Sequence, residues 1–224
     1  HLNQIERINS NAFESMKKVK SLSLNQNQIK LIENQAFNDL ESVETLDLSK
    51  NQLEKIAAKM FQPMKKLSYL YLNNNKLILI EKDGFIGLEN LETLDLTENH
   101  LKKIDGKLFE SLRKLNILNL KQNQINMIEK DGFSGLGNLE KLFLGFNRIE
   151  KISAKLFEPL KQLEKLNLEK NKIGEIEQDG FSGLDRLVSL DLGTNRLERI
   201  DSNMFKSLSS LKFLHLVKNQ IKSI

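Results

Sequence analysis

One 24-residue period runs through the whole chain and constrains its fold more than any other feature of the sequence. Asn recurs at this spacing without a slip, at Asn3, Asn27, Asn51, Asn75, Asn99, Asn123, Asn147, Asn171, Asn195 and Asn219. Phe recurs at the same spacing, at Phe13, Phe37, Phe61, Phe85, Phe109, Phe133, Phe157, Phe181 and Phe205. One such unit is too small to bury its own apolar face, whereas stacked copies form a continuous core. The period therefore predicts a single array over residues 1–224, with about nine repeats and no internal domain boundary.

The spacing of apolar residues inside one unit predicts its local structure. Leu46 and Leu48 are two positions apart, so both side chains point to the same face of an extended strand. Leu53, Ile56 and Phe61 follow at spacings of three or more, which favours turns and short helical or 3₁₀ segments. We therefore expect a solenoid with a parallel sheet on its concave face and turns and such short segments on its convex face.

The two repeating columns are predicted to be structural. Each Asn follows a strand, and its side chain can donate and accept hydrogen bonds to the backbone of its own unit and of the next. A buried backbone group left unpaired would cost about 1–3 kcal/mol. Each Phe is expected to stack on the convex side, where the wedge between units is widest. The residues given these roles are Asn51, Asn75, Asn99, Asn123, Asn147, Asn171, Phe61, Phe85, Phe109, Phe133, Phe157 and Phe181.

The unit, LxxLxLxxNxLxxIxxxxFxxLxx, resembles the leucine-rich repeat, in its 24-residue class with a convex Phe. The segments 94–99 (LDLTEN) and 142–147 (LFLGFN), followed by Phe109 and Phe157, illustrate the match. That class is typical of animal extracellular proteins such as Toll-like receptor ectodomains and insect leucine-rich immune proteins. The resemblance implies an α/β horseshoe that is rich in strands, and binding rather than catalysis. It also implies an extracellular or secreted protein, or a membrane-anchored ectodomain, while an intracellular array stays open.

The chain departs from that class in its ends. Extracellular members usually carry cysteine-rich caps, whereas this chain has no Cys and both of its ends lie within a repeat. An uncapped solenoid exposes an apolar end. We therefore expect residues 1–224 to be the interior of a longer protein whose missing flanking regions could also mediate oligomerisation. No apolar run exceeds four residues, so we expect no membrane span in this segment.

The search for catalytic chemistry gives no candidate residues. The three His residues, His1, His100 and His215, lack the spacing of metal ligands, and there is no Cys to join them. A glycine-rich phosphate loop is absent, and carboxylate pairs on a solenoid form solvated ladders rather than a closed pocket. We therefore predict no enzyme activity and no catalytic, metal or cofactor-binding residues.

The net charge of +4 calls for a test of nucleic-acid binding. Basic residues line one flank of every second unit, at Arg7, Lys55, Lys103, Lys151 and Arg199. Acids follow them closely, at Glu33, Glu81, Glu129 and Glu177. This pattern favours a paired, solvated flank over a track for phosphates, so no nucleic-acid partner is predicted. On the same flank, Ile78, Leu79 and Met127 form an alternative apolar contact patch.

A second period of 48 residues overlies the first. Asp83-Gly84-Phe85 recurs at residues 131–133 and 179–181, whereas the intervening units read Lys107-Leu108-Phe109 or similar. This doublet indicates that the array grew by duplication of pairs of units. It predicts convex turns of two alternating kinds.

The concave face carries the residues that we expect to bind a partner. Five aromatic residues remain outside the Phe column, and all five fall at variable positions of the predicted strand segment: Tyr69, Tyr71, Phe143, Phe146 and Phe213. His215 shares a column with Tyr71 and Phe143, and Asp95 lies between these two. Exposed aromatic residues commonly anchor protein interfaces, although these could also simply cover one another on the sheet.

Charge on this face is uneven along the array. Acids gather in its first half, at Glu44, Asp47, Glu92, Asp95 and Glu98. Lysines gather towards its other end, at Lys141, Lys165, Lys170, Lys212 and Lys218. Such polarity could orient a partner and raise its association rate.

These observations give one leading hypothesis and one alternative. The first is a non-catalytic protein-recognition module of an extracellular leucine-rich repeat protein, with an innate-immune receptor or immune factor as the setting that the resemblance implies. Its partner would be a protein bound on the concave face. The alternative is a structural array, either adhesive or intracellular, that spaces other domains.

Overall fold

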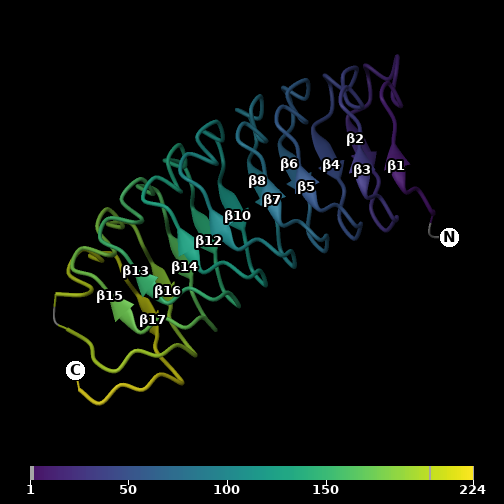
Figure 1. Cartoon of the computed structure of the whole chain (residues 1–224). Helices are drawn as coiled ribbons and strands as arrows, with labels where there is room; N and C mark the ends of the chain where they lie inside the picture. Colours follow the sequence, from purple (N-terminus) through teal and green to yellow (C-terminus); the bar gives the residue numbers. More distant parts are fainter. Residues whose placement is uncertain (1–2, 202, 224) are drawn as a thin grey trace.

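The computed structural model describes residues 3–201 and 203–223. Its 24-residue units form successive coils that stack side by side in one curved row, and the chain termini lie at opposite ends of this row (Figure 1). His1, one of the residues considered for metal binding, lies outside the described residues. The predicted solenoid fold is confirmed.

A nine-stranded parallel sheet runs along the array, with one strand from each coil. The strands are β2 (Ser21–Ser23), β4 (Thr45–Asp47), β6 (Tyr69–Tyr71), β8 (Thr93–Asp95), β10 (Ile117–Asn119), β12 (Lys141–Phe143), β14 (Lys165–Asn167), β16 (Ser189–Asp191) and β17 (Phe213–His215). In neighbouring strands, residues 24 positions apart lie opposite each other, as Leu46 does with Leu70. Their central Leu side chains point inward because alternate residues of a strand face opposite sides.

Eight shorter strands lie on one flank of the coils, where the sequence predicted no second long strand. They are β1 (Arg7–Ile8), β3 (Leu31–Ile32), β5 (Lys55–Ile56), β7 (Leu79–Ile80), β9 (Lys103–Ile104), β11 (Met127–Ile128), β13 (Lys151–Ile152) and β15 (Glu175–Ile176). They pair only two by two: β1 with β3, β5 with β7, β9 with β11, and β13 with β15. The 48-residue period is therefore visible in the backbone. We call the coils of β1, β5, β9 and β13 type A, and those of β3, β7, β11 and β15 type B.

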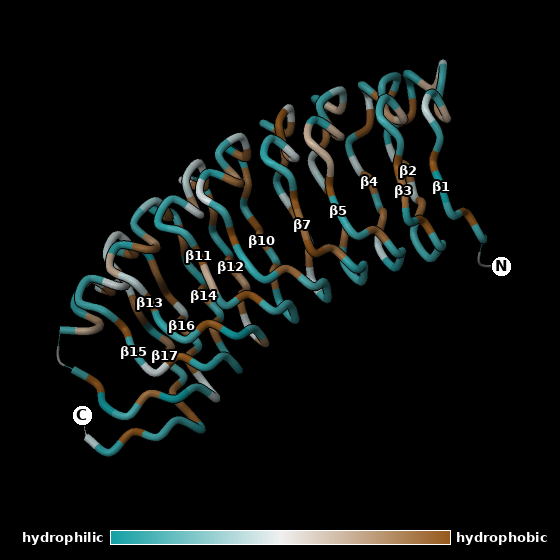
Figure 2. Tube along the Cα trace, in the orientation of Figure 1, coloured by the Kyte–Doolittle hydropathy of each residue, from teal (hydrophilic) through white to brown (hydrophobic). Residues whose placement is uncertain are grey.

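The core is continuous from coil to coil. Apolar residues recur at equivalent places in successive coils (Figure 2). Leu46, Leu48, Leu53 and Ile56 are buried in one coil, and the corresponding residues of the neighbouring coils pack against them. Stacking thus supplies the burial that a single unit cannot achieve.

The convex side consists of turns, and no residue within 3–201 or 203–223 adopts a helical or 3₁₀ segment. Backbone bonds do join residues three apart, as from the N–H of Met64 to the carbonyl of Phe61 (2.9 Å). The next such bond runs from the N–H of Leu67 to the carbonyl of Met64. Two consecutive residues therefore never both donate such a bond, which a 3₁₀ helix requires. Lys59, just before Phe61, has a φ of 62°, which interrupts any right-handed helix. Our expectation of short helical segments is therefore met only by single turns.

Two kinds of convex turn alternate along the array, as the doublet predicted. In type B coils, Gly87, Gly135 and Gly183 follow the Phe with φ near +90°. A Cβ on Gly135 would lie 2.5 Å from the backbone oxygen of Glu110 in the preceding coil, so only Gly fits. Type A coils carry Pro or Ser at the equivalent position; Pro63, Ser111 and Pro159 have no positive φ there, whereas Ser15 in the first coil has a φ of 68°.

The Phe column explains why the array curves. Six neighbouring pairs stack with ring centroids 5.7–6.2 Å apart. Neighbouring strands of a sheet are only about 4.8 Å apart. Because the spacing on the Phe side is wider, the row bends with the nine-stranded sheet on its concave face. Phe61, Phe85, Phe109, Phe133, Phe157 and Phe181 are all buried.

The repeating Asn side chains tie each coil to the preceding one. Nδ2 of Asn75 donates to the carbonyl of Leu72 in its own coil and to that of Leu48 in the preceding coil, both at 3.0 Å. Its Oδ1 accepts from the N–H of Leu53, also in the preceding coil (3.0 Å). The sequence predicts a contact with the following coil, and the structure corrects this: the partners lie in the preceding coil. After each Asn the chain advances towards the following coil. The N–H of Leu53 therefore lies next to Asn75 of the following coil and donates to it.

The same set of bonds recurs along the column. Each member donates to a Leu carbonyl of its own coil and of the preceding coil, and accepts from a backbone N–H of the preceding coil. These members are Asn51, Asn99, Asn123, Asn147, Asn171 and Asn195.

Candidate functional site

The residues beside each buried central Leu of the sheet point outward to the concave surface. Tyr69 and Tyr71 flank the buried Leu70 on β6; Tyr69 is exposed and Tyr71 is half-buried. The hydroxyl of Tyr69 lies 3.4 Å from Oε2 of Glu92. The negative charge of Glu92 raises the pKa of Tyr69 above its usual value.

One concave column collects most of the other predicted contact residues. Tyr71 lies opposite Asp95, and Asn119 lies opposite Phe143. His215 ends the column on β17, opposite Asp191, and Phe213 of the same strand is 58% exposed. Tyr71 and Phe143 are three strand spacings apart, or about 14 Å. The fold thus brings these residues onto one surface.

Phe146 lies beyond the strand to which the sequence assigns it. We expected it on a strand, but β12 ends at Phe143 and Phe146 lies in the turn that follows. Its φ is 58°, because the chain reverses there towards Asn147. The ring is 36% exposed. Nζ of Lys170 lies 4.3 Å from its centroid and Nζ of Lys121 lies 5.4 Å from it.

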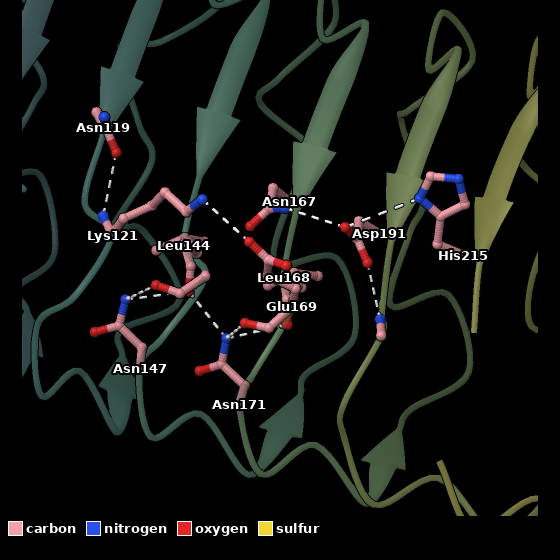
Figure 3. A network of polar contacts seen from close by, with 12 residues as sticks. Asn119, Lys121, Leu144, Asn147, Asn167, Leu168, Glu169, Asn171, Asp191 and His215 are labelled. Carbon is pink, nitrogen blue, oxygen red and sulfur yellow. Dashed lines mark hydrogen bonds and ion pairs between the residues drawn. The ribbon is translucent and has the colours of Figure 1, made fainter. Parts of the chain in front are cut away.

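An ion pair crosses the concave face next to Phe146. Nζ of Lys121 lies 3.0 Å from Oε1 of Glu169, although a whole coil separates the two residues (Figure 3). Gly145 occupies the equivalent position of the intervening coil. A Cβ there would lie 3.0 Å from Cγ of Glu169. The absence of a side chain at Gly145 therefore leaves the path between the two charges open.

Beneath this ion pair, Asn167 is 93% buried, at 7% exposure. Its Nδ2 donates to Oδ2 of Asp191 (3.3 Å), and the same oxygen lies 3.9 Å from Nδ1 of His215 (Figure 3). Oδ1 of Asn167 faces Gly145 and has no hydrogen-bond donor within the described part of the chain.

The sequence analysis gave Gly145, Asn167, Lys121 and Glu169 no role. A readable signal was present: residues of opposite charge stand 48 positions apart in one column, with Gly between them.

The lysines towards the C-terminal end of the concave face lack, among the described residues, the acidic partners that the basic residues of the flank have. No acid lies within 4.0 Å of any of five concave lysines, considering residues 3–201 and 203–223: Lys141, Lys165, Lys170, Lys212 and Lys218. Nζ of Lys165 instead lies 5.6 Å from the ring centroid of Phe143. These positive charges are available to a partner.

The flank is paired, as predicted. Each type A basic residue contacts an acid of its type B neighbour: Arg7 with Glu33, Lys55 with Glu81, Lys103 with Glu129, and Lys151 with Glu177. Oε2 of Glu81 also accepts from the N–H of Ala58 at 3.0 Å. That backbone bond, followed by Lys55, lowers the pKa of Glu81 below its usual value. A continuous track of free cations is therefore absent from this flank of the described residues.

Other surface features lie away from the concave face. Ile78, Leu79 and Met127 are exposed on the flank, and Leu79 lines a hollow of about 240 Å³. A larger hollow, of about 900 Å³, opens on the convex side between the coils of Phe85 and Leu108. No group of three or more His, Cys, Asp or Glu residues able to hold a metal ion occurs among the described residues. Nor does this part of the chain contain a helix long and apolar enough to cross a membrane.

Comparison with known proteins identifies the family. The sequence profile described as "Leucine rich repeat" matches residues 1–53, 42–101, 89–149, 125–173, 137–197 and 161–221. A TLR13 chain, from a crystal structure of the TLR13–ssRNA13 complex, is 30% identical over 95% of this chain, with a TM-score of 0.76. A leucine-rich repeat protein of Leptospira interrogans is 23% identical over 98% of the chain, with a TM-score of 0.74, which shows the fold alone.

The chain spans only part of these relatives, 34% of the TLR13 chain and 59% of the Leptospira protein. No curated protein matches the sequence in a direct search. The family profile nevertheless covers nearly the whole chain, in agreement with the repeated strand, Asn and Phe columns. The chain therefore belongs to the leucine-rich repeat family.

Proposed function

We propose that this chain is a non-catalytic protein-recognition module that binds its partner on the concave face. The observation that carries the proposal is the outward-facing column of Tyr71, Asp95, Asn119 and Phe143 on four successive strands of one sheet. Aromatic side chains on a fixed surface lose little conformational entropy on binding and commonly form interface hot spots. The two rings are about 14 Å apart, which lies within a standard protein interface.

The setting that we propose is an extracellular or secreted innate-immune protein. Support comes from the repeat class and from the similarity to TLR13. The Leptospira neighbour shares the fold and does not bear on the setting. The alternative is a scaffold, adhesive or intracellular, in which the array only spaces other domains. A scaffold would not need uncompensated charges and exposed aromatic residues on its concave face.

The test combines stability with binding. The double variant Tyr71→Ala/Phe143→Ala should keep the melting temperature of the parent, because the inward Leu residues hold the sheet. Its affinity for a purified protein partner should fall by about 2 kcal/mol or more for a true anchor. Ile78→Ala/Met127→Ala on the flank is the matched control and should bind like the parent. Normal binding by the concave variant, with loss in the flank variant, would move the site to the flank.

A further inference from the structure

Phe146 is the residue of the concave face that the fold explains least. From Asn27 to Asn219, the residue before each Asn of the column adopts a positive φ, and apart from Phe146 this position is occupied by a polar residue: Gln26, Lys50, Asn74, Glu98, Gln122, Lys170, Thr194 and Lys218. A bulky side chain is disfavoured in this left-handed region. Phe146 is also 36% exposed, so it adds little to the core. Backbone strain of this kind concentrates at functional sites.

Lysines surround this ring and the ring of Phe143. Lys170 lies over Phe146 at 4.3 Å and Lys165 over Phe143 at 5.6 Å. Such contacts hold an ammonium group near a ring. Lys165 and Lys170 lack an acidic partner among the described residues, whereas Lys121, the other lysine near Phe146, is already paired with Glu169. Two positive charges are thus positioned beside two rings and left uncompensated.

The neighbouring acids do not compensate these charges. Glu140 and Glu164 directly precede β12 and β14, at the end of the strands where Lys141 and Lys165 also lie, but among the described residues neither acid forms an ion pair within 4.0 Å with these lysines. Glu140 lines a separate hollow with Lys114 at that end of the strands. Across the sheet, Lys141 lies beside Lys165, which adds a third positive charge without an acidic partner in the described chain.

We propose that this part of the concave face, defined by Lys141, Phe143, Phe146, Lys165 and Lys170, binds an acidic segment of a protein that carries an aromatic side chain. The assignment rests on the proposed function and specifies the chemistry of the partner. Carboxylates of the segment pair with the lysines, and its aromatic side chain packs against the exposed edge of Phe146.

Single-stranded RNA is the other polyanion to consider, because TLR13 was crystallised with it. Two observations favour a protein. The ring of Phe146 has Lys170 and Lys121 close to it, whereas proteins that bind single strands present aromatic rings for bases to stack on. Glu169 and Asp191 also lie at this end of the sheet, where they can accept hydrogen bonds from the N–H groups of a peptide backbone, which the phosphate backbone of RNA lacks.

The probes are three polymers, tested with the whole chain at 150 mM salt by fluorescence anisotropy: a random copolymer of Glu and Tyr, poly-glutamate, and a uridine 12-mer. We expect the copolymer to bind at least tenfold more tightly than the other two. Lys165→Gln/Lys170→Gln should weaken copolymer binding at least tenfold. The control pair, Lys103→Gln/Lys151→Gln, removes the same charge from the paired flank and should change binding less than twofold.

A second variant separates the ring from the charges. Phe146→Asn suits the left-handed backbone, so its melting temperature should equal or exceed that of the parent, while the preference for the copolymer over poly-glutamate should disappear. Tighter binding of the uridine 12-mer, equal loss in the flank control, or no copolymer binding at millimolar concentration would each overturn the proposal. One further result would overturn this proposal while leaving the concave binding site in place. In that result a purified protein partner fails to bind Tyr71→Ala/Phe143→Ala but binds Lys165→Gln/Lys170→Gln normally.

Discussion

Lys121 and Glu169 form an ion pair across a whole intervening coil, with 3.0 Å between Nζ and Oε1. The pair is possible because the residue between them is Gly145, whose missing side chain leaves room for Glu169. The space is also filled from below, since Oδ1 of Asn167 packs against Gly145. The shape of the concave surface at this point therefore depends on the missing side chain of Gly145.

Gly145→Ala should destabilise the chain, since the new Cβ would collide with Oδ1 of Asn167. We expect a loss of about 1–3 kcal/mol in the free energy of unfolding, as for overpacking elsewhere. Gly137→Ala is the control, because a Cβ there would meet nothing within 4 Å. In an Asn167→Ala background the cost of Gly145→Ala should fall below about 1 kcal/mol, because the colliding amide is gone. Equal costs in both backgrounds, measured by urea denaturation, would contradict this account.

Phe109→Ala should cost about 3–5 kcal/mol of unfolding free energy, because the ring is fully buried and its neighbours in the column cannot close the cavity. Chemical denaturation of a capped version of the array measures this loss. Phe213→Ala is the matched control: it removes the same ring from a 58% exposed site and should cost less than about 0.5 kcal/mol. Similar losses at both positions would show that the Phe column does not carry the core.

Asn123→Ala should cost less than Phe109→Ala, at about 1–3 kcal/mol. The change removes the donor to the carbonyls of Leu96 (2.9 Å) and Leu120 (3.2 Å) and the acceptor for the N–H of Leu101 (3.1 Å). The N–H of Leu101 is left buried and unpaired, whereas the two carbonyls each keep one donor, from Asn99 and Asn147. Denaturation together with hydrogen exchange at Leu101 checks the mechanism: a loss of stability without faster exchange of that amide would argue against it.

The paired flank predicts a defined dependence of stability on pH. Backbone N–H groups and basic side chains lower the pKa of four carboxylates: Glu33, Glu81, Glu129 and Glu177. A carboxylate whose pKa is lower when folded stabilises the fold above its unfolded value, about 4.3, and this contribution disappears as pH falls towards the folded value. The parent should therefore melt above the fourfold Glu→Gln variant at pH 7, and the gap should close below about pH 4.3. A gap that stays constant down to pH 3 would refute the assignment.

The fold could be predicted from the sequence because one period places every inward residue. Leu46 and Leu48 specify a strand, and their copies 24 residues away specify its neighbours, so a local pattern determines long-range pairing. The helical segments on the convex side were the expectation that failed. Spacing alone could not reveal that Lys59 adopts a left-handed conformation, because such φ values depend on the closure of the whole coil.

The candidate site was only partly predictable. Tyr71 and Phe143 could be placed on the concave face because each follows the inward Leu of a predicted strand, and neighbouring residues of a strand point to opposite faces. Phe146 could not, since the strand ends three residues earlier. The contacts of Lys121 with Glu169 depend on the side-chain size of Gly145, which a search for periodic apolar residues ignores.

The doublet also has a physical basis that the sequence period only suggested. Within a doublet, β9 pairs with β11, Lys103 contacts Glu129, and the N–H of Gly106 donates to Oε2 of Glu129 (2.7 Å). Between doublets, β11 and β13 do not pair. A type A coil is therefore complementary to the type B coil that follows it, and the array should tolerate removal of whole doublets better than removal of single coils.

Two deletions test this. Removing residues 127–174 joins the coil of Lys103 to a type B coil, in which Glu177 takes the place of Glu129. Removing only residues 127–150 joins it to a type A coil, in which Ser153 takes that place and Lys151 lies beside Lys103. The amide of Gly106 should keep its protection from hydrogen exchange in the longer deletion and exchange at least about tenfold faster in the shorter one, because only the shorter deletion removes its acceptor. The amide of Ile78, bonded to the carbonyl of Glu54 in the preceding coil (2.9 Å), is the internal control and should behave alike in both deletions. If Gly106 exchanges equally fast in the two deletions, the complementarity of the two coil types is wrong.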